Sequence, residues 1–118
     1  YILTGTQIKI AAAIDGVFQH EELPLLTKRR DVAMLEASIM DKTEYGKPLN
    51  LRDLVTYELI TRNSFKPVLV PTQKQLMPSD LPLLQEIGVK GVIMGAIVTG
   101  TKAETIEKAV RDFKEGLS

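Results

Sequence analysis

The sequence predicts an α/β domain made of four strand–helix units with parallel strands. Segments of strand character begin near residues 8, 32, 68 and 92, and a segment of helical character follows each of them. The connections are short, and this alternation is typical of a parallel sheet with right-handed crossovers. A length of 118 residues fits one domain, and neither a linker nor a low-complexity segment divides residues 1–118.

The first unit is expected as a strand over residues 7–14 and a helix within residues 17–30. Isoleucines recur at a period of two in the strand, while three successive alanines leave a helix as the alternative. Pro24 requires either a break in the following helix or a helix that begins near Leu23.

The second unit is expected as a strand over residues 31–40, because a strand preserves the alternation of elements. The apolar residues of this segment would also share one face of a helix, which is the alternative. A polar loop over 41–48 leads to a helix over 50–63. Asn50 is the expected N-cap, and Asp53 three residues later completes a capping box.

The third unit is expected as a short strand over 68–70 and a helix that Ser79 caps, with Gly88 just beyond its end. In the fourth unit, residues 92–98 are all apolar except Gly95, which suits a strand buried on both faces. Thr101 is then expected to cap a last helix over 103–115.

The composition excludes several classes of function. Fifteen Lys and Arg residues balance fifteen Asp and Glu residues, which gives no electrostatic argument for nucleic acid or an anionic membrane as a partner. Cysteine is absent, so thiolate chemistry is excluded and a cytoplasmic location is favoured. The longest apolar run is far below the ~20 residues of a membrane span. The chain begins at Tyr1, and we expect a fragment of a longer or processed protein.

The last strand–helix unit resembles the closing unit of phosphate-binding (β/α)8 (TIM) barrels. In that superfamily a run of the form Gly-Val-Lys-Gly-Val-Ile-Met-Gly leads from a helix into the last strand, and the backbone beyond this strand holds a phosphate. The positions that match the pattern are Gly88, Gly91, Gly95, Thr99, Gly100 and Thr101. The resemblance covers residues 67–118, and it implies that the four units form half of a barrel. A flavodoxin-like open sheet is the alternative fold.

The resemblance implies a site where the strands end. Thr99, Gly100 and Thr101 would bind the phosphate, since a turn that opens a helix presents backbone N–H groups. A plain helix cap is the alternative role of this turn. The loop after the third strand has no glycine for the phosphate, so Thr72 and Gln73 are expected to offer side-chain donors instead.

Three charged residues complete the candidate site. Glu36 lies in an apolar strand, where desolvation would suit it to acid–base catalysis; an ion pair or a capping role is the alternative. Lys74 would neutralise a phosphate or form a Schiff base, and an exposed loop lysine is the alternative. Asp15 would bind a substrate hydroxyl or a divalent cation, although Asp-Gly is also a common turn. His20, the single histidine, is expected at the surface.

Two functions follow from these expectations. The first is an enzyme or enzyme fragment of lyase, isomerase or synthase type that binds a phosphorylated small molecule or a flavin, with Mg²⁺ as another candidate cofactor. The second is a non-catalytic half-barrel module that pairs with itself or with a missing half, because a half-barrel leaves two sheet edges to cover.

Overall fold

The computed structural model describes residues 2–4, 7–95 and 99–116, with side chains for residues 9–95 and 99–115. It shows one open five-stranded sheet whose strands follow one another in chain order. The strands are β1 (Ile2–Thr4), β2 (Gln7–Ile14), β3 (Val32–Ala37), β4 (Val68–Pro71) and β5 (Gly91–Ile93). Strands β2 to β5 are parallel, whereas β1 pairs with β2 in the antiparallel direction. The predicted α/β class and the four parallel strands are confirmed.

Helices follow the strands as expected, and their bounds differ from the prediction at several ends. The helices are α1 (Glu22–Thr27), α2 (Leu51–Arg62), α3 (Leu81–Glu86) and α5 (Ala103–Gly116), with short 3-10 turns at η1 (Lys42–Glu44) and η2 (Pro78–Asp80). Helix α1 begins near Leu23, as Pro24 requires. Gly88 takes a φ of 100° just past α3, the conformation expected beyond a helix end.

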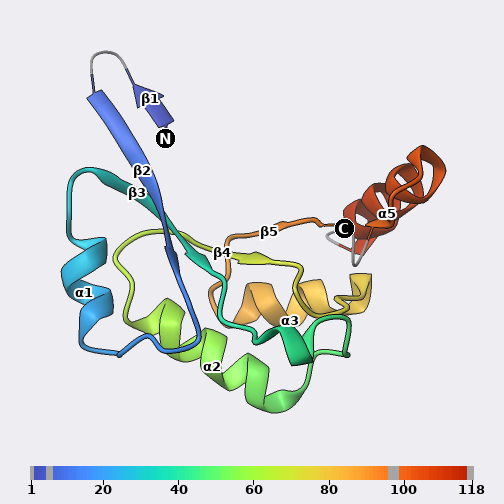
Figure 1. The fold of residues 1–118 in the computed structure, drawn as a ribbon, viewed down its shortest axis with the longest axis horizontal. Helices are drawn as coiled ribbons and strands as arrows, with labels where there is room; N and C mark the ends of the chain where they lie inside the picture. Colours follow the sequence, from blue (N-terminus) through green and yellow to red (C-terminus); the bar gives the residue numbers. More distant parts are fainter. Residues whose placement is uncertain (1, 5–6, 96–98, 117–118) are drawn as a thin grey trace.

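Helices α1, α2 and α3 lie on one side of the sheet, and α5 lies beyond the end of β5 (Figure 1). A doubly wound, flavodoxin-like sheet carries helices on both faces and reverses its strand order, so the present arrangement differs from that alternative. The core fills the space between the sheet and these helices. Its largest fully buried side chains include Tyr57, Leu23, Leu35, Ile60 and Leu84.

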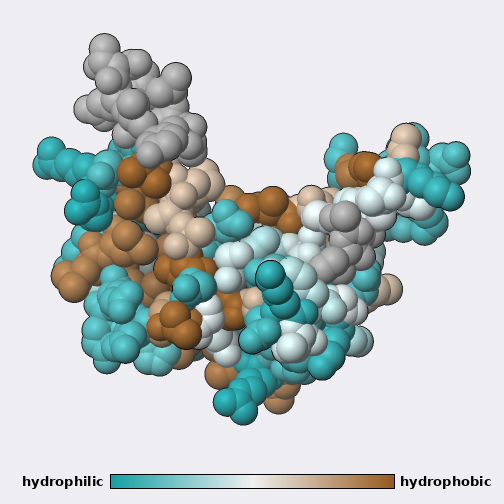
Figure 2. Space-filling view, viewed as in Figure 1, coloured by the Kyte–Doolittle hydropathy of each residue, from teal (hydrophilic) through white to brown (hydrophobic). Residues whose placement is uncertain are grey.

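The other face of the sheet has no helix over its centre. The strand register places Ala13, Glu36, Leu69 and Gly91 side by side on this face. None of these four residues is buried, whereas Leu35 and Val68 on the opposite face are. The molecule is hollowed on this side, between the N-terminal strands and α5 (Figure 2). We call this surface the open face.

Two local predictions were wrong, and one strand was not predicted. The unpredicted strand is β1, which pairs with β2 in the antiparallel direction. The predicted strand over 92–98 ends at Ile93, which is 41% exposed; Pro71 closes the neighbouring strand β4, and residues 96–98 lie outside the described part of the chain. Ser79 does not cap α3, because it lies inside the 3-10 turn η2 and Asp80 precedes the helix.

Candidate functional site

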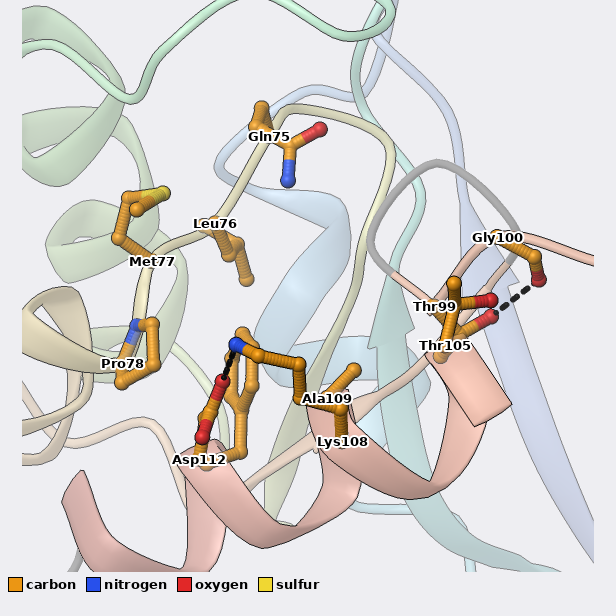
Figure 3. Close-up of a pocket in the computed structure, with 11 residues that line it drawn as sticks. Gln75, Leu76, Met77, Pro78, Thr99, Gly100, Thr105, Lys108, Ala109 and Asp112 are labelled. Atoms are coloured by element: carbon orange, nitrogen blue, oxygen red, sulfur yellow. Dashed lines mark hydrogen bonds and ion pairs between the residues drawn. The ribbon is translucent and has the colours of Figure 1, made fainter. Parts of the chain in front are cut away.

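A cavity of about 400 Å³ lies at the edge of the molecule where β4 and β5 end. One wall is the loop between β4 and α3, from Gln75 to Pro78. The other wall is the chain at Thr99 and Gly100 together with one side of α5 (Figure 3). Ligand sites for small molecules commonly enclose ~300–1,000 Å³, so the cavity has the volume for a small ligand.

Gly100 shapes the polar end of this cavity. Its φ of 69° is a conformation that glycine adopts readily, and a Cβ placed there would lie 2.7 Å from the Oγ1 atom of Thr105. Glycine thus lets the chain pass close to α5 before entering the helix. Thr99 is 8% exposed, and its hydroxyl donates to the carbonyl oxygen of Gly100 at 2.9 Å.

The first turn of α5 has no side-chain cap among the described residues. The predicted capping role of Thr101 is wrong, because Thr101 is exposed, makes no side-chain hydrogen bond and lies two residues before Ala103. Thr105 donates its hydroxyl to the carbonyl of Lys102 instead. The backbone N–H groups of this turn therefore have no side-chain acceptor, which is the condition for anion binding at a helix N-terminus.

Two polar side chains line the middle of the cavity. Lys108 pairs with Asp112 at 2.8 Å, and the lysine side chain is 73% exposed. Gln75 makes no side-chain hydrogen bond within the described chain, and its carboxamide extends into the space above Lys108 (Figure 3). An exposed i,i+4 pair contributes little to stability, so Lys108 can change partners at small cost.

Lys74 holds the loop that forms one wall of the cavity. Its side chain is 2% exposed, and its Nζ atom lies 2.9 Å from Asp53 and 3.1 Å from Glu44. The hydrogen bond to Asp53 is the main reason that the pKa of Lys74 is raised above its usual value. Lys47 and Lys74 likewise lower the pKa of Glu44. Lys74 is therefore a charged, paired lysine that ties the β4–α3 loop to α2.

Gln73 and Thr72 also connect neighbouring loops. The Gln73 carboxamide accepts from the backbone N–H of Met40 and donates to the hydroxyls of Ser38 and Tyr45. The Thr72 hydroxyl accepts from the N–H of Gly95 at 2.6 Å. Both side chains are buried. These two predicted ligand residues do not line the cavity and are used within the protein.

Glu36 and Asp15 lie apart from the cavity. Glu36 is half-buried on the open face, and its carboxylate has no hydrogen bond or ion pair to a described residue. Asp15 is exposed and accepts from the backbone N–H of Val17, as in a common turn. The structure therefore brings Thr99 and Gly100 to the cavity but leaves the predicted catalytic carboxylate elsewhere. His20 is exposed, as expected.

A second cavity of about 280 Å³ lies at the N-terminus of α2, and it differs in charge. Asp41, Glu44 and Asp53 line it, together with Arg52. Each of the three carboxylates already accepts a hydrogen bond from the protein. No three His, Asp or Glu side chains in the described ranges are placed to hold a metal ion, so no residue set is assigned to Mg²⁺.

Sequence reasoning missed the residues that α5 contributes to the larger cavity. Phe113 and Ala109 lie one helical turn apart and line it together with Lys108. The available signal was the apolar spacing of Ile106, Val110 and Phe113 on a charged helix, which indicates an amphipathic helix with one packed side.

Comparisons of this chain with protein-family models, curated proteins and solved structures found no match. Among the described residues, no helix combines the length and the apolar character needed to cross a membrane.

Proposed function

We propose that this chain binds a phosphorylated small molecule or a flavin in the 400 Å³ cavity, as part of an enzyme of lyase, isomerase or synthase type. One observation carries the proposal: the cavity is lined by Thr99 and Gly100, next to a first turn of α5 that no side chain of a described residue caps. A phosphate would accept from these backbone N–H groups, and the dipole of α5 favours its charge.

Lys108 adds the cation that such a site needs. Its Nζ atom points toward Asp112 (Figure 3), and because this pair is exposed, the side chain can turn toward the first turn of α5 and pair with a phosphate there. Glu104 lies in the same first turn and is exposed, while Lys102 lies just before it. These two charges offset one another, and so do Lys108 and Asp112, so the attraction for an anion comes from the N–H groups of the first turn and from a Lys108 that leaves Asp112 for the phosphate.

The acid–base part of the proposal is assigned to Glu36 on the open face. Its carboxylate has no hydrogen bond or ion pair to a described residue, but Glu36 does not line the cavity, so it can exchange a proton only with a part of the substrate that extends from the cavity onto the open face. Lys74 receives a positioning role instead. A Schiff-base lysine has to lose its proton, and the raised pKa of Lys74 opposes this loss.

A titration with inorganic phosphate tests the binding part. The backbone amide resonances of residues 99–105 are followed by NMR as sodium phosphate replaces sodium chloride at constant ionic strength. We expect saturable shifts in this segment and an affinity about 1.4- to fivefold weaker in Lys108→Gln, since an exposed charge pair is worth ~0.2–1 kcal/mol. Lys90→Gln removes one exposed lysine elsewhere and should bind as the wild type does. Shifts that never saturate would remove the proposal.

Once a phosphorylated substrate is turned over, Glu36→Gln tests the acid–base assignment. We expect a loss of kcat of ~10²–10⁴-fold for removal of a general acid or base. Glu86→Gln, at an exposed position on α3, is the matched control. Equal kcat values in the two variants would exclude Glu36 as the acid or base.

The open face supports a second candidate, an assembly module that pairs with itself or with a missing half-barrel. The outer edge of β2 pairs with β1 only at residues 7–9, and β5 pairs with β4 alone. Strand edges without a described partner and a sheet face that no described helix covers are features that a partner would bury. Ile93→Lys, on this face, should abolish self-association in sedimentation experiments, whereas Leu83→Lys on α3 should not; a wild-type monomer would exclude self-pairing.

A further inference from the structure

We infer that the ligand of the 400 Å³ cavity is a phosphate monoester that carries a planar aromatic group. This inference rests on the proposed function, and it adds the chemistry of the part that is not phosphate. The ring would lie along α5 beside Phe113, rather than over the open face of the sheet.

The cavity has one polar end and one apolar end. Thr99, Gly100 and Thr105 lie together at one end, whereas Met77 and Pro78 lie at the other (Figure 3). The Lys108–Asp112 pair stands between the two ends. A ligand that uses both ends therefore has an anionic head and an apolar body.

The apolar end is formed by fixed side chains and one adaptable side chain. Leu76 is 2% exposed and Phe113 is 5% exposed, so both are held by the core. Met77 is 52% exposed, and a thioether adapts to a ring placed against it. Aromatic side chains prefer offset-stacked or edge-to-face partners, which favours a ring over a flexible chain beside Phe113.

The length of α5 between the two ends of the cavity fits a ligand with a phosphate at one end and a ring at the other. From Thr105 to Phe113 the helix advances eight residues, which is ~12 Å at 1.5 Å per residue. A phosphate at the first turn and a ring beside the third turn fit within that length. Ala109 lies between them, and its small side chain leaves the cavity open there.

A sugar body fits this end less well than a ring. Its hydroxyl groups would lose water against Leu76, Met77 and Phe113. The polar partners there are Gln75 and the Lys108–Asp112 pair, whose two side chains are already paired with each other. Gln75 is the uncharged exception, because its carboxamide has no internal hydrogen bond and can meet one polar group at the edge of a ring. A site that leaves hydroxyls unpaired discriminates against the ligand that carries them.

The test compares inorganic phosphate, ethyl phosphate, glycerol 3-phosphate, phenyl phosphate and phenol by NMR titration of the full chain. Phenyl phosphate should bind about tenfold more tightly than ethyl phosphate, because it buries more apolar surface. It should also shift the resonances of Phe113 and Met77. Ala109→Leu narrows the cavity between its two ends, so a ring no longer reaches Phe113; this variant should abolish the preference while inorganic phosphate still binds. Ala109→Ser keeps the volume nearly unchanged and should retain the preference.

The outcomes separate this inference from the proposed function. If phenyl, ethyl and glycerol phosphates bind equally, the phosphate site stands and the aromatic inference is overturned. If neither phosphate nor its esters bind at residues 99–105, both are overturned. Phenol that binds as tightly as phenyl phosphate would show an apolar cavity without a phosphate site, and this also overturns the inference.

Discussion

The two longest helices that the structure describes, α2 and α5, begin at the same end of the sheet. The first turn of α2 is capped by side chains, whereas the first turn of α5 is not capped by any described side chain. At α2, the Asn50 side chain accepts from the N–H of Asp53, and the Asp53 carboxylate accepts from the N–H of Asn50. At α5, no described side chain accepts from the first turn. One helix start is closed by its own sequence, and the other remains open to an external acceptor.

The charged groups around the two helix starts also differ. Asp53 also pairs with buried Lys74, so the start of α2 is part of a closed network of charges. The start of α5 faces a cavity whose nearest charged pair is the exposed Lys108–Asp112 pair. The difference suggests that α2 stabilises the fold, and that α5 is free to serve a ligand.

The largest expected effect is the loss of the buried lysine. Lys74→Met leaves the half-buried Asp53 carboxylate without its ion partner, and breaking such a pair costs about 3 kcal/mol. Lys47→Met removes an exposed lysine from the same network and should cost at most about 0.5 kcal/mol. Urea unfolding of both variants measures the two costs. Equal costs would mean that Lys74 does not anchor the β4–α3 loop.

Alkaline pH should lower the free energy of unfolding, because Tyr57 of α2 is buried. Burial raises the pKa of Tyr57 in the folded protein, so the unfolded chain loses this proton first as the pH rises past about 10. The stabilising contribution is complete below that pH, and above it the free energy of unfolding falls by about 1.4 kcal/mol per pH unit for one proton. Tyr57→Phe should flatten this decline in urea unfolding between pH 9 and 11. An unchanged slope would contradict the assignment.

Capping gives a direct comparison of the two helices. Asn50→Ala should lower the free energy of unfolding by about 1 kcal/mol, the usual effect of losing an N-cap. Thr101→Ala should leave it unchanged within about 0.3 kcal/mol, since Thr101 caps nothing. A comparable loss in both variants, measured by thermal unfolding, would show that α5 is capped after all.

The sequence predicts those parts of the fold that short-range patterns determine. The Asn50–Asp53 capping box is a local signal, and the structure contains it. Residues 31–40 were ambiguous by pattern, and pairing of Val32–Ala37 with both neighbouring strands resolves them as a strand. The predicted strand over 92–98 extends too far, because apolar character alone does not show where the neighbouring strand ends.

Of the residues that line the candidate site, the sequence analysis named only those in the segment just before α5. Thr99 and Gly100 line the cavity, as expected of residues that follow the last strand. The partners of Lys74 and Gln73 come from other loops, and the sequence gives no spacing that would reveal them. Phe113 enters the site because α5 packs beside the β4–α3 loop, a tertiary contact that a helical pattern cannot specify.

The smallest expected effect is on the affinity of the cavity beside α5 for inorganic phosphate. Asp112 holds Lys108 at 2.8 Å and places a negative charge in the cavity. Asp112→Asn should free the lysine and remove a like charge, which raises affinity for inorganic phosphate about twofold, since such a helical pair is worth ~0.3–0.5 kcal/mol. Glu86→Gln, which removes an exposed carboxylate from α3 outside the cavity, is the control and should change affinity less. Weaker phosphate binding in Asp112→Asn would mean that Asp112 positions Lys108 for the ligand instead of competing with it.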